Sequence, residues 1–203
     1  MRYQFLIDSY ETERLKVLSV WSMFQDEDLL QRPHPVDRRG RSVIEQMVHQ
    51  CVSEDLWFRT MLGVDVGVPP LPRREARAEF ITQYAKSTAK RLEALGVQSE
   101  NWWEESVSFF DEKRPRTWVM VRRIAHTSHH RGQQMAMLRM LNRDLHSSYG
   151  PTADTGGLMQ NNAPVIYAYP DLESLLAGEQ AAGTKTPLPG PGSKPPTERP
   201  DLS

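Results

Sequence analysis

Two histidines stand four residues apart near the end of the longest helical stretch of this sequence, in the run His126-Thr-Ser-His-His-Arg-Gly-Gln133. On an α-helix, side chains at positions i and i+4 project from one face with Cβ atoms roughly 6 Å apart. Two imidazoles at that separation can bind one transition-metal ion at about 2.0–2.1 Å. The spacing of His126 and His130 therefore predicts half of a metal site.

The neighbours of this pair indicate which way it faces. On a helical wheel, Val119, Gln133 and Met137 lie within about 40° of His126, so the pair shares a partly apolar stripe and is predicted to point inward. Two buried imidazoles without partners would cost several kcal/mol unless a metal ion or carboxylates compensate. On spacing alone, the alternative of surface histidines on a solvated face stays open.

A third metal ligand must come from another helix, and His49 is the candidate in the second predicted helix. Val52 and Leu56 follow at i+3 and i+7 and indicate that His49 faces the core, although a lone histidine there is often only a hydrogen-bonded core residue. Cys51 is about 200° from His49 on a regular helix, so it cannot share the ion and is interpreted as a small buried apolar residue.

Two further residues are candidates for orienting the ligands. His129 lies about 100° from His130 on the wheel and is expected either to support the site from outside or to be exposed. Glu54, like Asp55, comes five or six positions after His49. Either carboxylate could accept a hydrogen bond from a ligating imidazole or lie on the solvated face of the helix.

Periodicity and capping signals predict the elements that position these residues. Four long helices are expected, followed by one short helix, over 3–25, 42–62, 73–95, 117–142 and 171–177. Ser42 and Glu45 form a capping box, and Gly96 is expected to end the third helix in a left-handed conformation. Residues 101–116 are aromatic without helical period, and we expect a loop there with one short extended segment.

Four helices with modest loops and no convincing strands predict an all-α fold, a four-helix bundle. We expect the bundle to occupy residues 1–149 and an irregular extension with its short helix, residues 150–183, to pack on it. The Pro/Gly-rich tail, 184–203, has too few apolar residues to bury a core and is expected to be disordered.

The composition excludes several classes of function. The 203 residues carry 25 basic and 26 acidic side chains, a net charge of −1, which gives no general reason to bind nucleic acid or anionic lipid. There is one cysteine, no apolar run reaches the ~18 residues of a membrane span, and the first residues lack a signal-peptide pattern. We expect a cytoplasmic protein without disulfides and without a membrane or nucleic-acid partner.

The run from His126 to Gln133, followed by Met137-Leu-Arg139, resembles the fourth-helix signature of the DinB-like (YfiT-like) family of proposed metalloenzymes. His49 followed by Glu54 is similar to the family's second-helix segment, and the resemblance covers roughly residues 3–145. It implies a four-helix bundle with one divalent transition metal (Zn, Ni, Fe or Mn) bound by His49, His126 and His130. It also implies a homodimer, because many members dimerise. By affinity order, Zn or Ni is expected in the purified protein.

The resemblance also implies a chemistry, since the characterised members act with low-molecular-weight thiols as transferases or isomerases. Three neutral histidines leave a divalent ion with net positive charge and open positions, where a thiol would be deprotonated. A metal-dependent hydrolase and a non-catalytic metal-binding stress or scaffold protein are the alternatives. The available cations are interpreted as members of helix-surface salt bridges rather than as ligands for a thiol's carboxylates: Arg122, Arg123 and Arg131.

A second apolar set on the fourth helix lies about 120–220° from His126, and it comprises Val121, Ile124, Met135 and Leu138. A helix that is apolar on two sides must be covered on both. The cover would be a second subunit or the segment 158–169, and we expect a homodimer for a small-molecule-binding protein of this kind.

Overall fold

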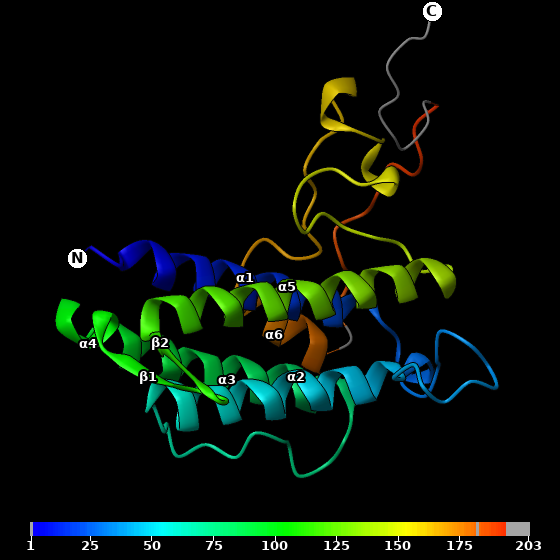
Figure 1. Cartoon of the computed structure of the whole chain (residues 1–203). Coiled ribbons are helices and arrows are strands. Elements are labelled where there is room, and N and C mark those ends of the chain that lie inside the picture. The colour runs from blue at the N-terminus through cyan, green and yellow to red at the C-terminus, as the bar shows by residue number, and fades with distance from the viewer. Residues whose placement is uncertain (1, 182, 194–203) are drawn as a thin grey trace, which may run out of the picture.

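The computed structural model describes residues 2–181 and 183–193, and it confirms the all-α expectation. Four long helices form the bundle (Figure 1): α1 (Gln4–Met23), α2 (Val43–Trp57), α3 (Arg77–Gly96) and α5 (Arg116–Met140). Helix α1 packs along both α3 and α5, and α2 packs against α5 on the other side. The interface between α2 and α5 is therefore where the histidines of the two helices meet.

The start of α2 follows the predicted capping box. Ser42 Oγ accepts a hydrogen bond from the Glu45 amide at 3.3 Å, and the Glu45 carboxylate accepts one from the Ser42 amide at 2.9 Å. The helix then continues into a π-helical turn, Phe58–Leu62, which ends at Gly63 in a left-handed conformation with φ of +74°. A glycine suits that position because it lacks the Cβ atom that would strain a positive φ.

The prediction for Gly96 was wrong. Gly96 is the last residue of α3, and Val97 after it has φ of −97°, so this helix ends without a left-handed residue. Helix α3 also begins at Arg77, four residues later than expected, because the Ala76 amide donates to the Arg74 carbonyl in a tight turn.

The stretch 101–116 is more ordered than the predicted loop. It holds most of a short helix, α4 (Glu100–Glu104), and a hairpin of β1 (Ser106–Phe109) and β2 (Glu112–Pro115). The strands are antiparallel, with Ser106 opposite Pro115. Val107 and Phe109 alternate toward the bundle and pack on its apolar core, which explains why four-residue strands form here. The hairpin covers the bundle end nearest to His126.

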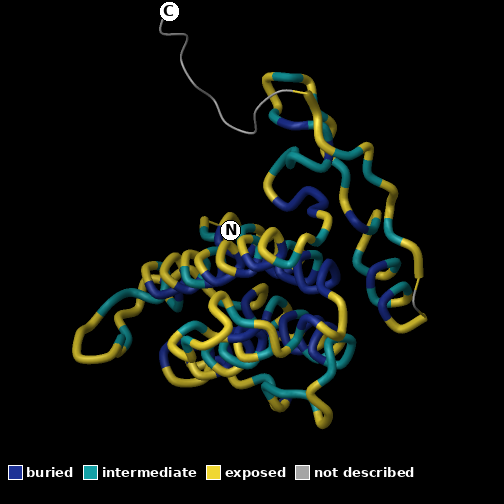
Figure 2. Tube along the Cα trace, turned by 90° about the vertical axis from the view of Figure 1, so that its right-hand side faces the viewer, coloured by how far each residue is buried: buried dark blue, intermediate teal, exposed yellow. Residues whose placement is uncertain are grey.

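The core consists of two apolar clusters inside the bundle, one centred on Trp21 and the other on Trp103, both fully buried. Figure 2 shows buried residues along the inward sides of the helices. Within the described residues, 2–181 and 183–193, we find no helix that combines the length and the apolar character needed to cross a membrane. Cys51 is buried with a free thiol, as the sequence predicted.

The extension after the bundle includes α6 (Leu172–Gln180), which contacts α1 and α3 and places Leu175 in the core. Much of the remaining extension rises away from the bundle as irregular chain, as Figure 1 shows. Residues 184–193 are also irregular, and the Thr186 amide donates to the Ala168 carbonyl. For the rest of the tail, 194–203, the prediction of disorder lies outside the described residues.

The predicted second apolar face of α5 is not a free surface. Leu138 is fully buried in the core, and Met135 and Ile124 are partly buried against the two apolar clusters. Only Val121 of that set is exposed, at 51%. Helix α1 packs along α5 within the chain, so a second subunit is not needed to cover the three buried members of this set.

Candidate metal centre

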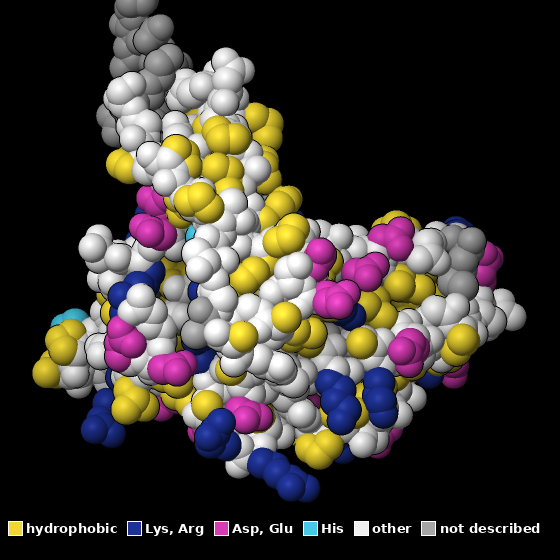
Figure 3. All heavy atoms as spheres, turned by 180° about the vertical axis from the view of Figure 1, so that it is seen from behind, with side chains coloured by type: hydrophobic (Ala, Val, Ile, Leu, Met, Phe, Trp, Pro, Cys, Tyr) yellow, Lys and Arg dark blue, Asp and Glu magenta, His cyan; other side chains and the backbone are white. Residues whose placement is uncertain are grey.

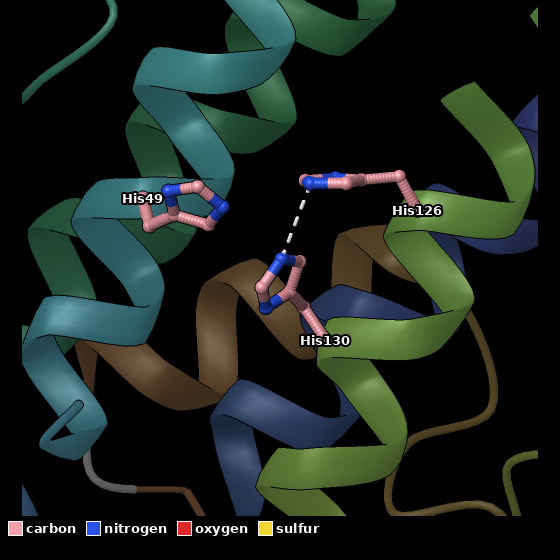
Figure 4. Close-up of side chains that lie close together, drawn as sticks. All are labelled: His49, His126 and His130. Atoms are coloured by element: carbon pink, nitrogen blue, oxygen red, sulfur yellow. Dashed lines mark hydrogen bonds between the residues drawn. The ribbon is translucent and has the colours of Figure 1, made fainter. Parts of the chain in front are cut away.

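The structure brings His49, His126 and His130 together across the interface of α2 and α5. Figure 4 shows the three rings converging, His49 from α2 and the other two from successive turns of α5. The ring centre of His49 lies 4.5 Å from that of His130 and 5.4 Å from that of His126. One nitrogen from each ring belongs to a set whose members all lie within 4.8 Å of one another.

The two histidines of α5 are spaced for a shared ion. Their Nε2 atoms lie 3.2 Å apart (Figure 4). Two nitrogens that each bind one ion at 2.0–2.1 Å with a tetrahedral angle are about 3.3 Å apart. The i,i+4 spacing on the helix therefore produces a separation that suits coordination by both rings.

His49 reaches the site for a different reason than the sequence indicated. The sequence predicts that Val52 and Leu56 share a buried face with it, but they are 41% and 46% exposed. His49 lies at the edge of the α2–α5 interface and is half-buried, as is His126, whereas His130 is buried. The cluster is therefore closed toward the core and open to solvent on one side.

Gln46 fixes the ring of His130. The Nδ1 atom of His130 lies 3.0 Å from Oε1 of Gln46, and only the protonated nitrogen can donate to a carbonyl oxygen. The Nε2 lone pair of His130 consequently points toward His126. Gln46 in turn donates through Nε2 to Gln133 at 2.9 Å, and Gln133 lies 3.0 Å from the exposed ring of His129. His129 therefore reaches the site in two ways, through the two glutamines and by packing its exposed ring against that of His130 at a ring-centre distance of 5.0 Å.

The sequence reasoning missed Gln46. It lies three positions before His49 on α2, and residues three apart share a helix face, so a search along that face would have found it. Nothing in the local sequence showed which histidine it would contact, because that contact joins residues 84 positions apart.

Burial sets the charge state of the cluster. Desolvation, followed by the charge of the neighbouring Arg123, lowers the pKa of His126 to about 3, and desolvation is also the largest cause that lowers the pKa of His130 to about 4. The pKa of His49 is also lowered by burial and then by Arg41 and Arg123. All three rings are therefore neutral at pH 7, the form in which imidazole binds a metal ion.

His126 has an apolar neighbour and an unsatisfied atom. Its ring centre lies 5.6 Å from that of Trp57, and its Nδ1 atom is buried without a hydrogen-bond partner in the described part of the chain. Buried polar atoms without partners are costly, so each one calls for an explanation such as a functional role or a bound ion. The histidine cluster therefore contains one buried ring nitrogen, Nδ1 of His126, whose hydrogen-bonding capacity is not used within the described chain.

Glu54 lies away from the three imidazoles. Its carboxylate accepts hydrogen bonds from Tyr10 at 2.6 Å, Tyr84 at 3.0 Å and Arg91 at 3.0 Å, all in the buried core. None of the hydrogen bonds found among the described residues joins Glu54 to a histidine of the cluster. The sequence predicts that Glu54 could accept a hydrogen bond from a ligating histidine, but in the structure Gln46 accepts that bond.

The surface interpretation of the α5 arginines was wrong for two of them. Arg123 is fully buried, donates to Thr127 and Ser53, and lies 4.0 Å from Glu54. Arg131 is buried in an ion pair with Glu13. Both are drawn inward by polar partners on other helices, whereas Arg122 is exposed as expected.

The cluster contains three nitrogen ligands and no fourth. Throughout residues 2–181 and 183–193, no other histidine, cysteine, aspartate or glutamate joins this group. Closed structural zinc sites have four protein ligands, whereas catalytic sites have three and an open position. The donor set has the number of ligands that is typical of the second kind.

The fold and the site define a class: a four-helix bundle with three convergent histidines between its second and last long helices. Residues 4–154 match the model of the DinB family, which is well over half of the chain. The chain therefore belongs to the DinB family. No curated protein matches its sequence.

Two solved structures share this fold. A DinB-like protein from Bacillus cereus has a TM-score of 0.63 and 18% sequence identity, and the match covers 71% of this chain and 95% of that one. A DinB-like protein from Bacillus subtilis has a TM-score of 0.55 and 13% identity, covering 69% and 94%. At these identities the likeness demonstrates the common bundle, and both matches leave about 30% of this chain uncovered.

Proposed function

We propose that this protein binds one divalent transition-metal ion through His49, His126 and His130. The observation that carries the proposal is the convergence of three neutral imidazoles, with two Nε2 atoms 3.2 Å apart. The three residues fit such an ion in donor chemistry, because neutral nitrogen ligands suit Zn, Ni and Fe. The lowered pKa values fit as well, since no proton must be displaced from the rings at pH 7.

We further propose that the centre is catalytic and that it serves a thiol-dependent transferase or isomerase. Three uncharged ligands leave the full charge of a divalent ion in place, and the site is open on the side of His49. An ion bound there would supply a Lewis acid that lowers the pKa of a thiol ligand and so makes the thiol nucleophilic at neutral pH.

The charges near the opening support an anionic thiol cofactor. Arg41 is exposed at the start of α2 and is close enough to lower the pKa of both His49 and His130. A guanidinium at that position suits a carboxylate of a low-molecular-weight thiol. The sequence had shown no cation placed for this role, because Arg41 precedes the helix and is brought to the opening by the capping box of Ser42.

Metal analysis of the purified protein tests the first proposal. The wild type should contain close to one ion per chain, and His49→Ala, His126→Ala and His130→Ala should each lose most of it. His129→Ala is the matched control, because His129 belongs to the same run and is exposed, and it should keep its metal. Full retention by all three variants would refute the proposed centre.

A thermal-shift screen with glutathione, bacillithiol and mycothiol tests the second proposal. A thiol that stabilises the metal-loaded protein, and neither the metal-free protein nor Arg41→Ala to the same extent, supports thiol chemistry. The absence of metal-dependent stabilisation by any of the three favours a hydrolase or a non-catalytic metal-binding protein.

A further inference from the structure

A pocket lies between α1 and the extension, apart from the histidine cluster. Its lining comes from the outer face of α1 and from residues 147–148 and 167–175, and it includes no residue of α2 or α5. About half of the lining belongs to residues beyond 154, where the match to the DinB family ends. The extension therefore adds a cavity that the bundle alone does not form.

The size of the pocket fits a small molecule. Its volume is about 230 Å³, whereas a cavity of roughly 150 Å³ is enough to hold benzene. A single ring with one or two substituents would fill it. The walls are mainly apolar: Leu15 from α1, Leu172 and Leu175 from α6, and the ring of Tyr169, whose hydroxyl is occupied by Glu179 at 2.6 Å.

Among the described residues, one buried polar side-chain atom of the lining has no hydrogen-bond partner. Ser19 Oγ is buried and makes no hydrogen bond within the described chain. A helical serine or threonine often donates to the carbonyl four residues earlier, as Ser9 and Thr12 of the same helix do. Ser19 makes no such bond, and its Oγ atom is turned away from solvent; rotation about the Cα–Cβ bond, which breaks no hydrogen bond, would bring the hydroxyl to a ligand at the pocket wall.

The charged groups of the lining are already paired. Lys16 lies 3.9 Å from the Glu13 carboxylate, and its ammonium is 3.5 Å from the ring centre of Tyr149. Asp171 caps α6 by accepting a hydrogen bond from the Ser174 amide at 2.7 Å. One cation and one anion, each with a partner, leave no net charge for an ionic ligand to neutralise.

We propose that this pocket binds a small neutral aromatic molecule with one hydroxyl or carbonyl group, which hydrogen-bonds to Ser19. The apolar walls enclose the ring, and the Ser19 hydroxyl meets the single polar substituent. Figure 3 shows hydrophobic side chains gathered on the extension that rises from the bundle. The proposal is independent of metal binding.

Ligand-observed NMR titrations of the full-length protein with p-cresol and toluene test the proposal. We expect p-cresol to bind saturably and toluene to bind about fivefold more weakly, because it cannot hydrogen-bond to Ser19. Ser19→Ala should reduce the affinity for p-cresol to that for toluene. Ser9→Ala is the matched control, since Ser9 already donates to the Phe5 carbonyl, and it should bind both probes as the wild type does.

Leu172→Trp should fill the pocket and abolish binding of both probes, and Leu15→Trp fills it from the α1 side if the first variant does not fold. His130→Ala should leave binding unchanged, which separates this pocket from the histidine cluster. The proposal is overturned by any of three results: no saturable binding of p-cresol, equal affinities before and after Ser19→Ala, or loss of binding in His130→Ala.

Discussion

Nδ1 of His130 on α5 lies 3.0 Å from Oε1 of Gln46 on α2, so a glutamine from one helix determines how a histidine of the facing helix presents its other nitrogen. The contact assigns the proton to Nδ1 and leaves the Nε2 lone pair directed toward His126, 3.2 Å away. The proposed centre therefore depends on a side chain that cannot itself be a strong metal ligand.

Replacing Gln46 with leucine should lower the metal affinity about 10- to 100-fold, the usual cost of removing a group that orients a ligating histidine. Competition with a chromophoric chelator measures the change. Gln46→Glu retains an acceptor for Nδ1–H and should lose much less. An affinity of Gln46→Leu equal to that of the wild type would show that the contact does not orient the ring.

The metal-free protein should lose stability between pH 6.5 and about 4. The pKa of His126 is about 3 and that of His130 about 4 in the folded chain, against an ordinary value of 6.5. In that window the unfolded chain takes up protons that the folded chain does not, so unfolding becomes more favourable as the pH falls.

Melting temperatures in the presence of a chelator, at pH 7 and pH 5, measure this effect. The decrease should be smaller in His126→Leu, which removes one of the three imidazoles whose pKa is lowered, and unchanged in the control His129→Leu. An identical decrease in the wild type and in His126→Leu would contradict the assignment.

The parts of the site that the sequence predicted are those encoded locally. His126 and His130 are one helical turn apart, and the Ser42 capping box sets the start of α2, so both follow from short-range geometry. Gln46 and the burial of Arg131 depend on partners more than 80 positions away. Their roles emerge only when the helices pack, because no spacing along the chain specifies which faces meet.

The hairpin before α5 is a part of the fold that the sequence alone did not predict. Each strand has four residues, which is too short for the alternation of β1 to stand out against the neighbouring aromatic residues. The strands form because Phe109 packs against Trp57 and Trp118, at ring-centre distances of 5.2 and 5.0 Å. Tertiary contacts, rather than local propensity, decide the structure there.

The ion pair of Arg91 and Glu54 should be essential for stability. Both side chains are 1% exposed, and their atoms lie 3.0 Å apart. Arg91→Ala leaves the carboxylate buried with a lost partner, and we expect a loss of about 3–5 kcal/mol in the free energy of unfolding. Arg59→Ala is the control, because its pair with Asp55 is about half exposed on the arginine side and should contribute less than about 1 kcal/mol. Urea denaturation measures both, and similar losses would contradict the prediction.

A homodimer remains a prediction, and of the apolar set that the sequence indicated for it, the structure leaves Val121 exposed beside two apolar residues outside that set. Trp118 and Val121, one turn apart on the outer face of α5, are 38% and 51% exposed, and Phe110 of the hairpin turn is exposed beside the same helix end. An apolar surface of this kind is commonly buried by a second copy of the chain.

Light scattering should therefore show a dimer that Trp118→Lys and Val121→Lys each shift toward monomer. Met140→Lys, at an exposed apolar position at the far end of α5, should leave the dimer intact. A wild-type chain that stays monomeric as its concentration is raised would exclude this assembly, and equal dissociation by Met140→Lys would place the contact elsewhere.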